Sequence, residues 1–97
     1  MRNMRIDQDI DVFTSPALRD QITRDIRASN GVFTIDIRTV RYIDSVGLGL
    51  LVYTKHVLQQ DGRALRLLVE PESSVERIVD ITGLRSLLNV SAERSTR

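Results

Sequence analysis

The hydrophobic residues of this chain change their spacing along the sequence, and this alternation limits the folds it can adopt. In residues 15–28 apolar side chains recur every four positions with charged residues between them, which indicates an amphipathic helix. In residues 32–38 apolar and polar residues alternate, and residues 64–70 are rich in aliphatics, so both segments are expected to be strands. Helices separated by strands, with connections too long for hairpins, predict an α/β fold in which helices cover a small sheet.

Start signals place the boundaries of the helices. Ser15 followed by Pro16 predicts an N-cap and the first helical position of one helix. Ser73 with Glu76 three residues later is a capping box that opens another. A helix between them is expected over about residues 46–60. Its apolar residues fall into two groups at helical spacing: Val46, Leu50, Tyr53 and Val57, and Leu48, Leu51, Val52 and Leu58.

Length and composition exclude several classes of protein. The 97 residues have room for one domain, and we expect a core over residues 6–90 followed by a polar tail, 91–97. With 14 Lys and Arg against 13 Asp and Glu, the net charge of +1 argues against a nucleic-acid binder, which needs a concentrated basic surface. The absence of cysteine excludes thiol nucleophiles and Cys-ligated zinc. Without an apolar run long enough for a signal peptide or a membrane span, we expect a cytoplasmic protein with no membrane partner.

Residues that carry enzyme chemistry are sparse in this sequence. The single histidine, His56, has no second histidine or cysteine with which to bind a metal. Gly47 and Gly49 lack the third glycine of a phosphate-binding loop. Asp44, Ser45 and His56 do not make a catalytic triad, because the serine lacks the glycine that a nucleophile elbow places two residues earlier. We therefore expect no enzymatic activity, no metal and no cofactor bound by the chain itself.

The pair Asp44 and Ser45 precedes two glycines at the expected start of the second helix. One interpretation is capping, in which Ser45 or Asp44 accepts a hydrogen bond from an orphan amide of the helix. The other is that small neighbours leave the Ser45 hydroxyl open to an incoming protein, and that it accepts a phosphoryl group. A phosphate would bring about −1.5 to −2 charges to a helix N-terminus, which tolerates them, although Asp44 would repel it. The residues alone leave both interpretations open.

Three segments, in order along the chain, resemble the STAS-domain family and, within it, the bacterial anti-sigma factor antagonists. Residues 40–51 (VRYIDSVGLGLL) are similar to the signature around the family's phosphorylatable serine. Residues 10–18 (IDVFTSPAL) are similar to the segment that enters the first helix, and residues 77–84 (RIVDITGL) to a C-terminal segment. The resemblance implies an α/β fold: a small mixed β-sheet of about four strands with helices packed mainly on one face. Gln8 stands where the family usually has glycine and few residues precede Ile6, so we expect the N-terminal strand to be shortened or absent, with an exposed sheet edge through which a homodimer pairs.

The resemblance also implies a function in transcription regulation and the stress response. The unphosphorylated chain would bind an anti-sigma factor serine kinase and release a sigma factor, and phosphorylation of Ser45 would switch binding off. Because Val46 stands where the family often has Ser or Thr, Ser45 is the only hydroxyl candidate in the motif. The kinase would supply ATP and Mg²⁺, and a PP2C-like phosphatase would be a further partner. The implied partner-binding residues are Asp11, Thr14, Asp44, Ser45, Val46, Gly47 and Leu48.

Two questions remain open from the sequence. The first is whether the chain is instead a structural STAS module, a constitutive scaffold in a signalling assembly or a lipid-transport complex, whose affinity would not change on Ser45→Asp. The second is whether the helix that begins near Val46 presents one apolar side to a partner or buries both sides within the domain.

Overall fold

Four strands and three helices make up the regular structure of residues 3–95, the part of the chain that the computed structural model describes. Residues 1–2 of the expected domain and residues 96–97 of the expected tail lie outside the described residues. The strands are β1 (Met4–Arg5), β2 (Phe33–Asp36), β3 (Leu65–Val69) and β4 (Val90–Ala92). The helices are α1 (Ser15–Arg27), α2 (Ser45–Gln60) and α3 (Ser74–Ile81).

The strands form one sheet in the order β1-β2-β3-β4, which confirms the predicted α/β fold and its number of strands. Every strand pair in the described residues is parallel, for example Phe33 beside Leu65 and Leu67 beside Val90, so the expectation of a mixed sheet is wrong for this part of the chain. The reason lies in the connections: a helix joins each strand to the next and returns the chain to the same end of the sheet, so that successive strands run in the same direction. The short β1 forms one edge, and its pairing with a second copy stays a prediction.

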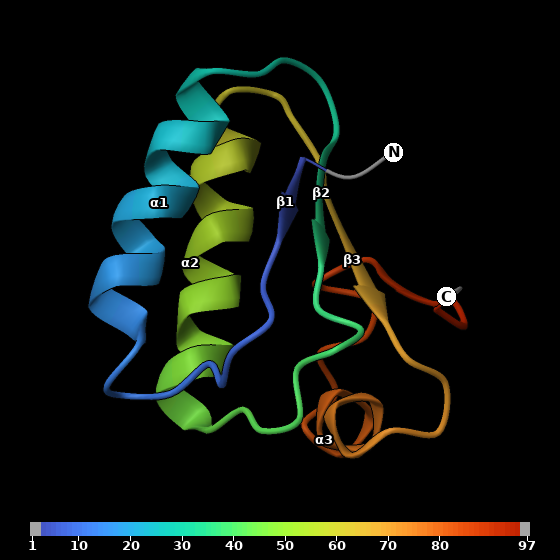
Figure 1. The fold of residues 1–97 in the computed structure, drawn as a ribbon. Coiled ribbons are helices and arrows are strands. Elements are labelled where there is room, and N and C mark those ends of the chain that lie inside the picture. The colour runs from blue at the N-terminus through green and yellow to red at the C-terminus, as the bar shows by residue number, and fades with distance from the viewer. Residues whose placement is uncertain (1–2, 96–97) are drawn as a thin grey trace.

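Helices α1 and α2 lie side by side along one face of the sheet, and α3 lies near the carboxyl end of β3 (Figure 1). The core fills the space between this face and the two helices. From the sheet it receives the buried side chains of Met4, Phe33, Ile35, Leu65, Leu67 and Val69, and from the helices those of Leu18, Ile22, Ile26, Leu50, Leu51 and Leu58. On α2, Val46 and Tyr53 remain exposed, whereas Leu48, Val52 and Val57 are half-buried against the core, so neither of the two predicted apolar groups is fully buried.

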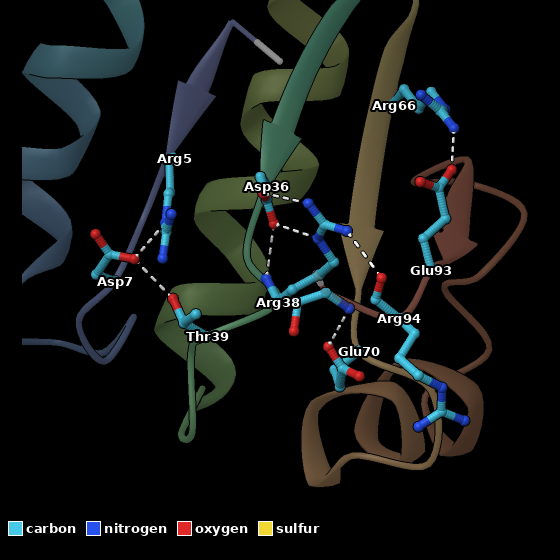
Figure 2. A network of polar contacts seen from close by, with 10 residues as sticks. Arg5, Asp7, Asp36, Arg38, Thr39, Arg66, Glu70, Glu93 and Arg94 are labelled. Atoms are coloured by element: carbon cyan, nitrogen blue, oxygen red, sulfur yellow. Dashed lines mark hydrogen bonds and ion pairs between the residues drawn. The ribbon is translucent and has the colours of Figure 1, made fainter. Parts of the chain in front are cut away.

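The polar residues of β2 are buried, although the alternating pattern predicts a strand exposed on one face. Thr34 and Asp36 are each only 4% exposed. The Asp36 carboxylate accepts hydrogen bonds from the Arg38 backbone N–H and from Nε, both at 3.0 Å, and forms an ion pair with the guanidinium at 2.9 Å. Arg38 also donates to the Arg94 carbonyl at 3.3 Å, so its side chain spans the strand and the C-terminal segment (Figure 2). The long side chain of Arg38 thus covers the Asp36 carboxylate.

The C-terminal segment is paired further than the expected end of the core at residue 90. Ser91 and Ala92 belong to β4 and lie beside Leu68 and Val69 of β3. Beyond the strand, the Glu93 backbone N–H donates to the Val69 carbonyl at 2.9 Å. Polarity alone therefore misplaced this boundary, because backbone hydrogen bonds of an edge strand do not require apolar side chains.

The helix starts agree with the sequence in two cases and differ in one. Ser73 caps α3 and accepts a hydrogen bond from the Glu76 N–H at 3.1 Å, as the capping box predicts. At α1 the N-cap is Thr14, and Ser15 is the first residue of the helix. The Ser15 hydroxyl is buried and has no hydrogen-bond partner among the described residues.

Within residues 3–95 no helix has the length and apolar character needed to cross a membrane.

Candidate functional site

Asp44, not Ser45, is the N-cap of α2, which decides between the two capping residues that the sequence left open. Its backbone is extended, and its Oδ1 accepts a hydrogen bond from the Gly47 N–H at 2.9 Å. This bond satisfies one of the backbone donors that the first turn leaves unpaired. The hydroxyl of Ser45 is consequently not needed for capping. Ser45 is exposed, and within residues 3–95 its hydroxyl has no hydrogen-bond partner.

The loop that leads into α1 is fixed by hydrogen bonds between its own residues. Asp11 Oδ1 accepts from the backbone N–H groups of Phe13 and Thr14, at 2.9 and 3.0 Å. In return, Thr14 Oγ1 accepts from the Asp11 N–H at 3.0 Å and donates to the Asp9 carbonyl at 2.7 Å. The two side chains therefore satisfy each other's backbone groups, in the reciprocal manner of a capping box. Asp11 and Thr14 hold the conformation of this loop.

Hydrogen bonds join this loop to the segment that precedes α2. The Ile10 N–H donates to the Tyr42 carbonyl at 3.1 Å, and the Asp44 N–H donates to the Ile10 carbonyl at 3.2 Å. A third bond runs from the Val12 N–H to Asp44 Oδ2 at 3.2 Å. Asp44 thus accepts from the loop through one oxygen and from α2 through the other. Asp11, Thr14, Asp44 and Ser45, singled out from separate parts of the sequence, come together at one end of the molecule.

The two glycines of the first turn of α2 have different surroundings. A Cβ on Gly47 would lie 2.0 Å from the Ile10 carbonyl oxygen, so only glycine allows the loop to approach the helix this closely. A Cβ on Gly49 would meet nothing within 4 Å. Gly47 is buried and Leu48 packs against the core, whereas Val46 is 45% exposed. Of the expected partner-binding residues in this turn, Ser45 and Val46 face solvent, and Gly47 and Leu48 position them.

A groove of about 680 Å³ lies between α1 and α2 beside this site. Gly49 leaves it open on the α2 side. Arg19 of α1 places its guanidinium 4.3 Å from the centre of the Tyr53 ring of α2, which is a cation–π contact across the groove.

His56 is exposed further along α2, and within residues 3–95 no three His, Cys, Asp or Glu side chains are grouped so as to hold a metal ion.

Sequence reasoning missed Val12 and Phe13, which are exposed at the tip of the α1 loop. Phe13 is 87% exposed and Val12 is 51% exposed. The signal in the sequence is a pair of apolar residues between Asp11 and Thr14, where a polar turn is expected. Their place beside Ser45 depends on the hydrogen bond from the Val12 N–H to the Asp44 carboxylate. These two residues are 32 positions apart, so the local sequence pattern does not reveal the contact.

Comparisons with known proteins agree with this architecture. The model of the STAS domain family matches residues 2–96. The anti-sigma-B factor antagonist of Bacillus subtilis (strain 168) is 33% identical over 88 residues, which cover 88% of this chain and 76% of that protein. The anti-sigma-B factor antagonist of Staphylococcus epidermidis is 32% identical, covering 91% of this chain and 81% of its own length. The protein of the same name from Staphylococcus aureus (strain NCTC 8325 / PS 47) is 31% identical over the same shares.

Proposed function

This chain belongs to the STAS domain family, and we propose that it is an anti-sigma factor antagonist that phosphorylation of Ser45 switches off. The unphosphorylated chain binds an anti-sigma factor that is also a serine kinase, and the sigma factor held by that kinase is released. Relatives named anti-sigma-B factor antagonists, which cover most of the chain, support the first part of this proposal. The geometry at the start of α2 supports the second.

The observation that carries the proposal is the exposed Ser45 hydroxyl without a hydrogen-bond partner in the described residues. A phosphoryl acceptor must present its oxygen to the γ-phosphate of ATP, and a hydroxyl already engaged by the backbone would first have to break that bond. Ser45 shares its exposure with Ser86 and Ser95 among the described residues, but neither of these two lies at the start of a helix. Four other serines are engaged or buried. Ser29, Ser73 and Ser74 donate to backbone carbonyls, and the Ser15 oxygen is buried.

In this reaction the chain is the substrate, and the kinase supplies ATP and Mg²⁺. The Ser45 oxygen forms a bond to the γ-phosphorus as the bond from that phosphorus to the ADP oxygen breaks, and the hydroxyl proton passes to a base of the kinase. A PP2C-like phosphatase then hydrolyses the phosphoserine and restores the binding form. The backbone amides at the start of α2 favour a negative group at this position, so the helix need not melt when it is modified.

The phosphate would prevent binding through charge and desolvation. It adds about −1.5 to −2 charges next to the Asp44 carboxylate, whose two oxygens already accept hydrogen bonds. The exposed neighbour on the other side is Val46, whose side chain offers no hydrogen-bond donor to a phosphate. An interface that packs closely on the Ser45 hydroxyl therefore loses complementarity on modification, while the domain keeps its fold.

The test uses the purified chain and the serine-kinase anti-sigma factors of the same genome, taken one at a time with Mg-ATP. Mass spectrometry should place one phosphate on Ser45, and Ser45→Ala should remain unlabelled. Ser74→Ala is the matched control, because that hydroxyl starts a helix but donates to the Arg41 carbonyl. In the same assay the chain should displace the sigma factor. Label elsewhere, or undiminished label on Ser45→Ala, would contradict the phosphorylation step, and equal binding by Ser45→Asp would favour a constitutive scaffold.

A further inference from the structure

The exposed apolar side chains of this protein gather at the end where Ser45 lies. Within residues 3–95 eight large hydrophobic side chains are exposed, and four of them belong to residues 12–13 and 42–46. These two segments are joined by the backbone bond between Ile10 and Tyr42 and by the bond from Val12 to Asp44. The most exposed of the eight is Phe13, at 87%. An exposed aromatic side chain beside other apolar groups is typical of an interaction surface.

Phe13 stands on a loop whose backbone is held from two sides. The Phe13 N–H donates to Asp11 Oδ1 at 2.9 Å, and the neighbouring Val12 N–H donates to Asp44 Oδ2 at 3.2 Å. The loop conformation is thus set before any partner arrives. Binding through a rigid aromatic side chain orders few torsions, so most of the gain from burying the ring appears as affinity.

We infer that Phe13 is an anchor residue for the anti-sigma factor and inserts into an apolar socket of that partner next to the bound nucleotide. The inference rests on the proposed function, because it takes the kinase as the occupant of this surface. A kinase that reaches the Ser45 hydroxyl must cover the neighbouring Asp44, and the loop is bonded to that same carboxylate. The partner therefore cannot approach Ser45 without meeting the loop that carries Phe13.

The experiment measures the affinity of the anti-sigma factor for the wild-type chain and for Phe13→Ala, with ADP and Mg²⁺ present. The matched control is Ile81→Ala, because Ile81 is 75% exposed on α3, outside the two joined segments. Loss of an aromatic anchor should weaken binding by about 30-fold, which corresponds to about 2 kcal/mol, whereas the control should bind within twofold of wild type. With ATP, the KM of the chain as a substrate should rise while kcat changes little, since Phe13 does not touch the reacting atoms. Thermal melting of Phe13→Ala should match wild type, because an exposed ring contributes little to the fold.

The outcomes separate this inference from the proposed function. If wild type binds and is phosphorylated on Ser45 while Phe13→Ala binds within threefold of it, the anchor is refuted and the function stands. If no anti-sigma factor of the genome binds the wild-type chain, both are refuted. A concentration-dependent dimer that Phe13→Ala dissociates, with unchanged affinity for the anti-sigma factor, would assign the surface to a second copy and also overturn the inference.

Discussion

Replacing Gly47 by alanine tests the close approach of the α1 loop to α2. The added Cβ would lie 2.0 Å from the Ile10 carbonyl oxygen and 2.7 Å from its carbon. Both atoms belong to the backbone, so no side-chain rotation removes the clash. Either the helix start or the loop must move, and the bond from the Asp44 N–H to the Ile10 carbonyl is the first to be lost.

The expected change combines two losses and one gain. Overpacking of a fixed backbone typically destabilises by about 1–3 kcal/mol. Losing the hydrogen bond at Ile10 adds about 1 kcal/mol, and the higher helix propensity of alanine returns up to about 1 kcal/mol. The free energy of unfolding should therefore fall by about 1–3 kcal/mol. For a domain of this size each kcal/mol corresponds to about 4–8 °C in Tm, so the Tm should fall by about 4–24 °C.

Gly49→Ala is the matched control, because it makes the same chemical change two residues along the same helix. Its Cβ would meet nothing within 4 Å, so only the propensity gain remains and the chain should become more stable by up to about 1 kcal/mol. Urea unfolding followed by circular dichroism measures both variants. If Gly47→Ala is as stable as wild type, or if the two variants shift in the same direction, the close approach of Ile10 to α2 is refuted.

Three further predictions concern side chains with defined partners. Asp44→Ala removes the acceptor of two backbone bonds and should lower the free energy of unfolding by about 1–3 kcal/mol, with Asn losing less, as urea unfolding would record. Ser15→Ala removes a buried hydroxyl without a partner in the described residues, so the free energy of unfolding should stay the same or rise by up to about 1 kcal/mol. A fall of more than about 1 kcal/mol would contradict the assignment of Thr14 as the N-cap. Hydrogen bonds from the Ser95 N–H to Glu70, from the Glu72 N–H and Arg85 to Glu76, and from Arg85 to Asp80 lower the pKa of each carboxyl. A lowered pKa in the folded state means that the unfolded chain binds more protons as the pH falls. The contribution of these carboxyls to the free energy of unfolding should therefore be constant above their ordinary pKa values, 4.5 for Glu and 3.8 for Asp, and fall as the pH drops below them. Glu76→Gln should flatten that fall.

The sequence predicts the elements whose signals are local. The four-residue period of residues 15–28 and the capping box of Ser73 and Glu76 are properties of single helices, and both are found in the structure. The resemblance supplies the family, and the comparisons confirm it. Periodicity alone would not have supplied it, since many α/β folds share the same alternation.

Features that depend on particular side-chain hydrogen bonds are mispredicted or missed. Asp36 reads as the polar side of a half-buried strand, yet Arg38 and the C-terminal segment cover it. Ser15 precedes a proline as an N-cap should, but the bonds between Asp11 and Thr14 shift the start of the helix by one residue. The bond from Arg38 to Arg94 joins residues 56 positions apart, whereas the bonds between Asp11 and Thr14 are close in sequence but precede the helix, and both outweigh the preference of the local residues.

The arrangement around Ser45 separates the groups that hold the fold from those that the proposed switch uses. The loop and α2 are held together by backbone groups and by the Asp44 carboxylate, and close packing at Gly47 leaves little freedom between them. None of these bonds involves the Ser45 hydroxyl or the Phe13 ring, both of which point to solvent. A phosphate on Ser45 therefore changes the charge of the surface without removing a bond that the domain needs. A switch built in this way acts on the affinity of the partner, and it predicts that the phosphorylated and unphosphorylated chains unfold at nearly the same Tm although only one binds the anti-sigma factor.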